Sequence, residues 1–189
     1  LGLEGNDTLI GGAGDDVISG DQGDDTIIDV VGSGLLRGGA GDDTITVGSQ
    51  TSLWSGTVYG DDGNDTITFA HGDLASGGAG DDLFVLQDLG EGPGATITIT
   101  GGDTGETLGG GDTLQLGELA DLSTLNITST TTNASGNTSY SGSVLLDDGT
   151  TLNFSQIENI ICFGRGTVIK TIEGEKRIED LKPGTKVLT

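Results

Sequence analysis

Aspartate recurs in the first 85 residues at one fixed position of a nine-residue pattern, a spacing suited to binding cations. The pattern reads G-x-x-G-x-D-x-U-x, in which U is a large apolar residue. Its six copies begin at Gly2, Gly11, Gly20, Gly38, Gly60 and Gly77. Position 6 of these copies is always an aspartate: Asp7, Asp16, Asp25, Asp43, Asp65 and Asp82.

Glycine is equally regular at position 4 of the pattern. The six residues there are Gly5, Gly14, Gly23, Gly41, Gly63 and Gly80. Glycine lets the backbone adopt positive φ and approach an ion closely, so that its carbonyl oxygens can act as ligands. Calcium prefers six to eight oxygen ligands from carboxylates and carbonyls. We therefore predict that these aspartates and glycines bind several calcium ions.

The elements that must position these ligands are short strands. Position 8 is apolar in every copy: Leu9, Ile18, Ile27, Ile45, Ile67 and Phe84. Around it lie β-branched runs such as Thr26–Ile28, typical of half-buried strands. A period this short predicts a solenoid, because each unit buries its apolar residue only by stacking on the next. We expect two copies, or 18 residues, to form one turn.

The phase of the copies predicts two unequal edges. Alternate copies face the same edge, so Asp7, Asp25 and Asp43 should stack at intervals of 18, followed by Asp65 and Asp82 at intervals of 22 and 17. The opposite edge would carry Asp16, then Gly34 where a carboxylate is missing, and then Asp73 as its remaining candidate. We expect a row of about four calcium ions on the first edge and few on the second.

Two other interpretations of this composition are weaker. Glycine provides 37 of 189 residues, and such content without a period is typical of disorder. Aspartate in glycine-rich loops is often only a turn residue. Six copies, most of them in phase, favour the calcium-bound solenoid instead.

Catalysis finds little support among residues 1–161. His71 is the single histidine, so an H-E-x-x-H zinc site is impossible. Paired aspartates such as Asp15 and Asp16 could suggest a glycosidase, but their repetition favours metal loops.

The charge of the chain is strongly asymmetric. The net charge is −23, and residues 1–161 hold 26 of the 30 acidic residues with one basic residue, Arg37. This acidic part should repel itself without divalent ions, and calcium should act as a folding switch. It has the wrong sign for a nucleic-acid partner. No apolar stretch is long enough to span a membrane.

Beyond residue 88 the period fades and ordinary strand patterns follow. The strand candidates are Ala95–Thr100, Asp112–Leu116, Leu125–Ser129, Ser143–Leu146 and Thr151–Phe154. The polar segment Thr130–Ser143 is typical of a hairpin loop or an exposed strand pair. Because solenoids need atypical terminal units, we interpret residues 89–161 as a β-rich capping region.

The nonapeptide resembles the calcium-binding repeat of RTX (haemolysin-type) proteins. The resemblance implies an all-β fold, a parallel β-roll or right-handed β-solenoid, over residues 1–88. Leu152–Ile161 also looks like the closing segment of many RTX rolls. The resemblance further implies a secreted bacterial protein, extracellular or on the cell surface, exported by type I secretion machinery. Because the chain starts inside a repeat, we expect further sequence before Leu1.

Residues 162–189 differ in character, with six basic and four acidic residues. They suggest a strand, a Glu-Gly turn, a second strand, a helical turn at Ile178–Leu181 and a Pro-Gly turn. The segment from Cys162 resembles the beginning of a Hint (hedgehog/intein) domain, and is interpreted as a truncated N-terminal part of one. The resemblance implies that the Cys162 thiol attacks the carbonyl of Ile161, so that the chain cleaves itself there once in a complete Hint domain.

Three interpretations of the whole chain stay open at this point. The first is a calcium-induced folding module of a secreted protein. The second is the C-terminal part of an extracellular hydrolase or cytolysin whose active portion lies upstream. The third is an adhesin whose repeats are the working surface. The sequence does not indicate an oligomeric state.

Overall fold

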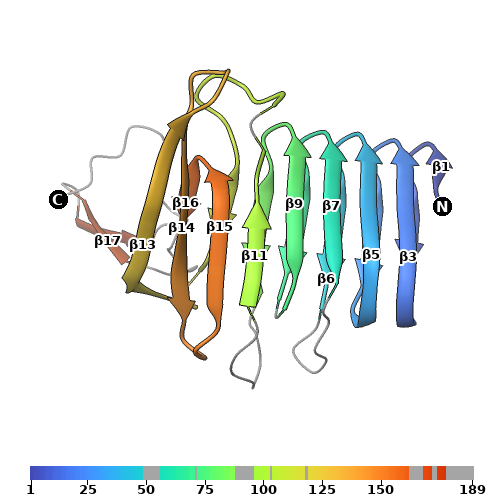
Figure 1. Cartoon of the computed structure of the whole chain (residues 1–189), viewed down its shortest axis with the longest axis horizontal. Coiled ribbons are helices and arrows are strands. Elements are labelled where there is room, and N and C mark those ends of the chain that lie inside the picture. The colour runs from blue at the N-terminus through green and yellow to red at the C-terminus, as the bar shows by residue number, and fades with distance from the viewer. Residues whose placement is uncertain are drawn as a thin grey trace.

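Every regular element that the structure describes is a β-strand (Figure 1). The computed structural model describes residues 1–48, 56–70, 72–87, 96–102, 104–117, 119–161, 168–171 and 174–177. Within these ranges no helix has the length and apolar character needed to cross a membrane.

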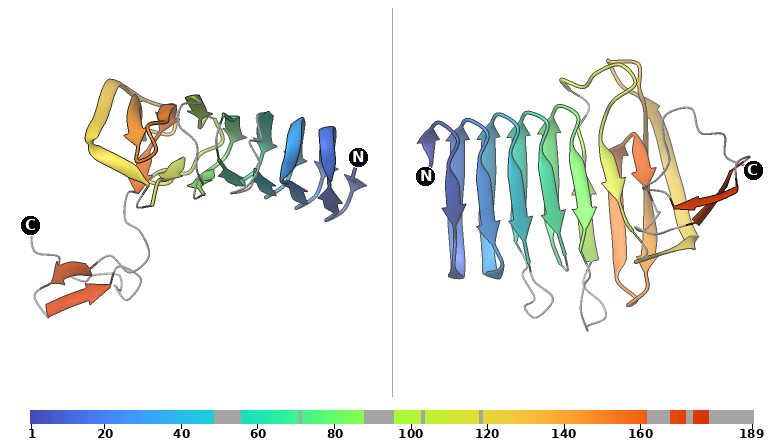
Figure 2. Two further views of the ribbon diagram at one scale, coloured as in Figure 1. Left: turned by 90° about the horizontal axis from the view of Figure 1, so that it is seen from below. Right: turned by 180° about the vertical axis from the view of Figure 1, so that it is seen from behind.

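The strands form two large sheets that face each other along the length of the molecule (Figures 1 and 2). The nine-stranded sheet contains, in spatial order, β1 (Leu3–Glu4), β3 (Ala13–Gln22), β5 (Val31–Ala40), β7 (Thr57–Asp62), β9 (Leu74–Ala79), β11 (Thr96–Thr100), β15 (Thr151–Ile157), β14 (Thr138–Leu146) and β13 (Ala120–Thr132). The seven-stranded sheet contains β16 (Asn159–Ile161), β12 (Thr113–Gln115), β10 (Leu83–Leu86), β8 (Thr66–Phe69), β6 (Thr44–Val47), β4 (Thr26–Asp29) and β2 (Thr8–Ile10).

The register of the strands confirms a parallel β-solenoid with two nonapeptides in each turn. In the seven-stranded sheet Leu9 pairs with Ile27, and Ile27 with Ile45, both at intervals of 18. Ile45 then pairs with Ile67, and Ile67 with Phe84, at intervals of 22 and 17. These are the intervals expected from the aspartates, so the predicted phase of the copies is correct.

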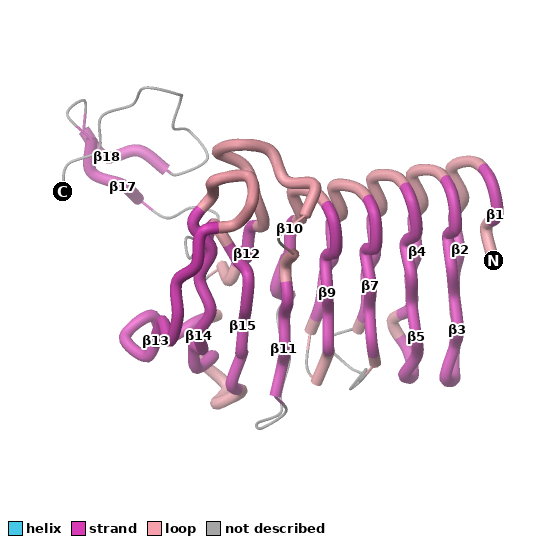
Figure 3. The backbone as a smooth tube through the Cα atoms, turned by 45° about the horizontal axis from the view of Figure 1, so that its top comes forward, coloured by secondary structure: helices cyan, strands magenta, loops and turns pink. Residues whose placement is uncertain are grey.

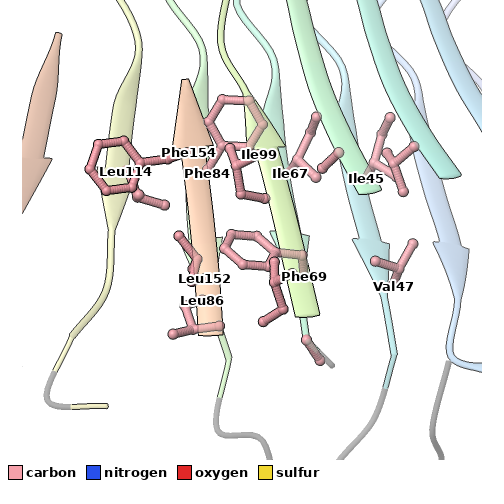
Figure 4. Close-up of a cluster of buried hydrophobic side chains, with 14 of the residues drawn as sticks. Ile45, Val47, Ile67, Phe69, Phe84, Leu86, Ile99, Leu114, Leu152 and Phe154 are labelled. Carbon is pink, nitrogen blue, oxygen red and sulfur yellow. The ribbon is translucent and has the colours of Figure 1, made fainter. Parts of the chain in front are cut away.

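Apolar side chains from the two sheets fill the interior of the coil in columns. One column follows the register of the seven-stranded sheet and includes Ile27, Ile45, Ile67, Phe84 and Leu114, all fully buried. The facing column belongs to the nine-stranded sheet and includes Ile18, Leu36, Val58, Ala75, Ile99 and Phe154. Figure 4 shows part of this interior, where the phenylalanines Phe69, Phe84 and Phe154 gather toward the cap. The predicted position-8 residues therefore form the core, with Leu9 only half-buried at the N-terminal end.

Both sheets continue beyond residue 88, and an antiparallel hairpin then completes the nine-stranded sheet. β11 lies parallel between β9 and β15, whereas β14 runs antiparallel to both β15 and β13. The segment Thr130–Ser143 contains the end of β13, the hairpin turn and most of β14, so it is a strand pair; it is exposed on β13, whereas Ser139 on β14 is buried. Its turn is closed by the Asn133 amide N–H, which donates to the carbonyl of Asn137 at 3.0 Å.

A separate two-stranded sheet follows in the C-terminal segment. β17 (Val168–Thr171) and β18 (Gly174–Arg177) pair antiparallel, in agreement with the two predicted strands. Cys162 and the expected helical turn at 178–181 lie outside the described residues.

The columns make a testable prediction about stability. Ile67→Ala removes a fully buried side chain between Ile45 and Phe84 and should lower the free energy of unfolding by about 2–5 kcal/mol, because a cavity remains. Ile10→Ala is the matched control, since Ile10 is 71% exposed. Urea unfolding in calcium measures both variants, and equal midpoints would contradict this packing.

Candidate metal-binding edge

The loops that connect the two sheets align along one edge of the coil (Figure 3). Five of the six position-6 aspartates, all except Asp16, form a single column at this edge. The amide N–H of each member donates to a carboxylate oxygen of the next one along the chain. The N···O distances are 2.7 Å from Asp7 to Asp25 and from Asp25 to Asp43, and 2.8 Å from Asp43 to Asp65 and from Asp65 to Asp82. We call this column the inner ladder.

The inner ladder extends two steps further than the sequence predicted. The amide of Asp82 donates to Oδ1 of Asp112 at 2.9 Å, and the amide of Asp112 donates to Oε2 of Glu158 at 2.8 Å. Its complete membership is Asp7, Asp25, Asp43, Asp65, Asp82, Asp112 and Glu158.

A sequence signal for Asp112 does exist. Residues 110–114 match positions 4 to 8 of the nonapeptide, but Gly101, which occupies the place of position 1, is displaced by an insertion. Glu158 is harder to recognise because glutamate replaces aspartate. Only the pairing of Leu114 with Ile160 places Glu158 in register with Asp112.

The second oxygen of each inner aspartate is buried and has no hydrogen-bond partner among the described residues. This holds for Oδ2 of Asp7, Asp25, Asp43, Asp65, Asp82 and Asp112. A buried carboxylate oxygen without a partner is costly, and proteins normally pair it or coordinate it to a metal. The inner ladder therefore fits a row of cations by the chemistry of its donors.

Glycine at position 1 makes room for these oxygens. A Cβ on Gly20 would lie 2.1 Å from Oδ2 of Asp25 and 2.6 Å from the carbonyl oxygen of Gly38, one coil further on. A carboxylate oxygen and a backbone carbonyl oxygen thus share one small space, as calcium coordination requires. The same arrangement recurs at Gly38 and Gly60.

Glycine at position 4 is required for a different reason. All six predicted residues have φ between 108° and 142°, a region that side chains other than glycine rarely adopt. At Gly63, for example, a Cβ would lie 1.9 Å from the carbonyl oxygen of Gly41. The position-4 glycines therefore let successive loops stack closely.

A second column of side chains lies outside the first and is exposed. Here each position-5 side chain accepts the amide N–H of the following coil, in the direction opposite to the inner ladder. The amide of Asp42 donates to Oδ1 of Asp24 at 3.0 Å, and that of Asn64 to Oδ1 of Asp42 at 2.8 Å. We call this column, Asn6, Asp24, Asp42, Asn64 and Asp81, the outer ladder.

The opposite edge of the coil is less regular, as the sequence predicted. Asp16 pairs in register with Gly34, so the carboxylate is absent from the next coil. Asp29, which sequence reasoning missed, is fully buried, and its carboxylate approaches both Gly11 and Gly34. Asp73 is also buried and accepts the amide N–H of Ala70 at 3.0 Å.

Burial raises the pKa values of four inner-ladder aspartates, and the negative charges of neighbouring carboxylates add to the effect. The pKa is raised to about 6 for Asp43 and for Asp82, to about 7 for Asp65 and to about 8 for Asp112. These four aspartates therefore resist full ionisation at neutral pH unless positive charge is supplied.

Comparison with known families agrees with this geometry. Residues 1–28 and 32–51 match the family model of the RTX calcium-binding nonapeptide repeat, in four copies. This part of the chain carries RTX calcium-binding repeats. The inner ladder continues past the matched residues through Asp65 and Asp82 with the same hydrogen bonds. No curated protein and no solved structure matches the chain.

The RTX repeats support calcium binding by this chain. Proteins with such repeats are typically secreted. The individual ligands stay predictions, and Cys162 lies outside the described residues.

The raised pKa values predict an unusual pH dependence without calcium. A carboxylate whose pKa is higher in the fold than in the unfolded chain stabilises the fold while protonated, and this contribution is lost as the pH rises through the folded pKa. In EDTA the free energy of unfolding should therefore fall between about pH 4 and pH 8.

Circular dichroism in EDTA at pH 5 to 8 measures this dependence as a loss of the β-sheet signal with rising pH. Asp112→Asn should reduce the fall, whereas Asp147→Asn, at an exposed position, should leave it unchanged. Stability that rises over this range in EDTA would be contrary to the proposed burial of the carboxylates.

Proposed function

We propose that residues 1–161 are a calcium-dependent folding module of a secreted bacterial RTX protein. The observation that supports this most directly is the row of buried aspartate oxygens, repeated coil after coil without a hydrogen-bond partner among the described residues. No enzyme activity is proposed for this module.

The residues that would hold calcium are those of the inner ladder. Asp7, Asp25, Asp43, Asp65 and Asp82 offer Oδ2, and a position-1 carbonyl of the following coil lies beside this oxygen in the first four. Five aspartates leave four intervals between coils, which is the basis for a row of about four ions. Asp16 and the position-4 glycines stay secondary candidates for ligands.

When bound, calcium would supply the positive charge that the buried carboxylates lack. The described residues contain one salt bridge, between Arg37 and Asp61 at 2.8 Å, and it involves no member of the inner ladder. A cation that binds the stacked coils and not the open chain stabilises the fold by mass action. The acidic chain would therefore stay open at low calcium concentration and form the roll at high concentration.

This dependence suits a protein that leaves the cell. Extracellular calcium modules have dissociation constants of roughly 0.1–1 mM, so the chain would be unfolded in a calcium-poor cytosol and fold outside. Export by type I secretion machinery is part of this proposal. Within it, residues 1–88 are the calcium-binding roll, residues 89–161 are its capping region, and residues 162–189 belong to a Hint domain.

A matched pair of variants tests the inner ladder. Asp43→Asn keeps an acceptor for the amide of Asp25 but removes the charge at the buried oxygen. It should raise the calcium concentration at the folding midpoint by about tenfold or more, because ligand charge sets the affinity for calcium. Asp42→Asn is the control, because Asp42 belongs to the exposed outer ladder.

Circular dichroism during calcium titration gives the folding midpoint, and isothermal titration gives the number of ions. If wild-type protein has the same β-sheet signal in EDTA as in calcium, the folding switch is refuted. Equal calcium midpoints of folding for the two variants would show that the inner ladder is not the calcium site.

We further propose that Cys162 is the nucleophile of Hint self-cleavage. In a polypeptide that includes a complete Hint domain, mass spectrometry should find a product ending at Ile161. Cys162→Ala should leave the same polypeptide intact, because no other cysteine is present in the sequence. An uncleaved wild-type polypeptide would remove this part of the proposal.

A further inference from the structure

Three carboxylates meet where the roll joins its capping hairpin. One ligand oxygen each from Glu106, Asp112 and Glu158 lies within 4.8 Å of the other two. Asp112 and Glu158 come from the last two steps of the inner ladder, whereas Glu106 comes from the inserted segment between Gly101 and Asp112. No copy of the nonapeptide contains either glutamate.

The cluster contains two buried oxygens that have no hydrogen-bond partner among the described residues. These are Oε1 of Glu106 and Oδ2 of Asp112. Glu106 is only 7% exposed and Asp112 is fully buried. Two such oxygens beside a third carboxylate are strongly unfavourable unless a positive charge lies between them.

The other oxygens of the cluster are held by hydrogen bonds that fix the three carboxyl groups. Glu158 accepts the amide of Asp112 at Oε2, and its own amide donates to the carbonyl of Asp112 at 3.0 Å. Oε2 of Glu106 accepts hydrogen bonds from the side-chain amides of Asn133 and, at 3.1 Å, Asn137. These hydrogen bonds leave Oε1 of Glu106 and Oδ2 of Asp112 without a partner among the described residues.

The same two asparagines belong to the turn between β13 and β14. The side-chain amide of Asn137 also donates to the carbonyl of Thr107 at 2.9 Å, and its carbonyl oxygen accepts the amide of Gly109 at 2.8 Å. Ser135 donates to the carbonyl of Glu106 at 2.8 Å. The hairpin turn therefore lies directly against the segment that carries Glu106.

We propose that Glu106, Asp112 and Glu158 bind one further calcium ion, which fastens the β13–β14 hairpin to the last coil of the roll. All three donors are carboxylate oxygens, the ligands that calcium prefers, and at 2.3–2.6 Å from calcium two such ligands lie up to about 5 Å apart. The site goes beyond the row proposed for the nonapeptides, because none of its three ligands lies in the six copies. Calcium would then control attachment of the cap as well as stacking of the coils.

Equilibrium dialysis of the 189-residue chain against calcium, with the number of bound ions counted, tests this site. Glu106→Gln should bind one ion fewer than wild type. Asp147→Asn, a change at an exposed carboxylate in the turn after β14, should bind the wild-type number. Retention of the wild-type number and affinity by Glu106→Gln would overturn the proposal.

Stability gives an independent measurement, because Glu106→Gln should lower the stability of the fold in calcium and should not lower it in EDTA. In EDTA, Glu106→Gln should fold at the same or a lower concentration of the osmolyte TMAO than wild type, because it removes a repelling charge. In calcium it should unfold at lower urea concentration. A variant that needs more TMAO in EDTA and also unfolds at lower urea concentration in calcium would show a purely structural role for Glu106 and would overturn the proposal.

Two further variants keep the result interpretable. Glu158→Gln should lose the same ion, so a folded Glu158→Gln protein with the wild-type count would also overturn the proposal, even if Glu106→Gln fails to fold. Asp43→Asn separates this site from the row, since it should lose an ion from the row and keep this one. If Asp43→Asn binds the wild-type number of calcium ions and Glu106→Gln binds fewer, the row of ions along the nonapeptides is rejected and the site at Glu106 is retained.

Discussion

Repulsion between stacked carboxylates is the constraint on which this structure depends. Parallel strands lie about 4.8 Å apart, so a side chain repeated once per coil lies almost directly over its predecessor. Two like charges about 5 Å apart repel by about 3 kcal/mol at an effective dielectric constant of about 20. The inner ladder places seven acidic side chains in this relation and partly buries most of them. The backbone amides of the ladder satisfy one oxygen of each of the aspartates from Asp25 to Asp112 and leave the other without a hydrogen-bond partner among the described residues.

The apolar columns and the glycines both make this stacking of carboxylates possible. Stacked residues such as Ile45 and Ile67 hold the coils in register inside the roll, while glycine permits loops to approach more closely than side chains would allow. The core can form only if the loops stack, and the loops stack stably only if their charge is compensated. In the calcium-dependent folding that we propose, metal binding and burial of the core would therefore be coupled in one transition.

The sequence predicted the regular part of the fold because the same physical requirement is repeated in every copy. Position 8 is buried in each copy after the first, and the position-6 aspartates of alternate copies share an edge. The spacing of the aspartates therefore predicted both the length of a coil and the first five members of the inner ladder. The prediction weakened where the repeat is interrupted. Asp112 was missed because an insertion separates it from Gly101, and Glu158 because its place is set by strand pairing across 46 residues.

Long-range contacts explain the remaining omissions. Asp29 reaches the opposite edge from a strand position that pairs with the apolar Val47, which no local pattern would indicate. Glu106 meets Asp112 and Glu158 only because the hairpin turn of β13–β14 packs against its segment. Such a site requires the three-dimensional arrangement of the cap.

Two successive copies are needed for one complete coil, so the structure of the roll repeats every 18 residues. Removing a whole pair of nonapeptides would shorten the stack by one coil and bring equivalent neighbours together. Removing a single nonapeptide would turn every later coil by half a revolution and transfer its carboxylates to the other edge. The observed intervals between paired residues are 18, 18, 22 and 17. Each still spans one complete coil, because the differences in length are absorbed within the coil. Changes in the length of such a protein are thus tolerated in steps of two copies or as loop insertions.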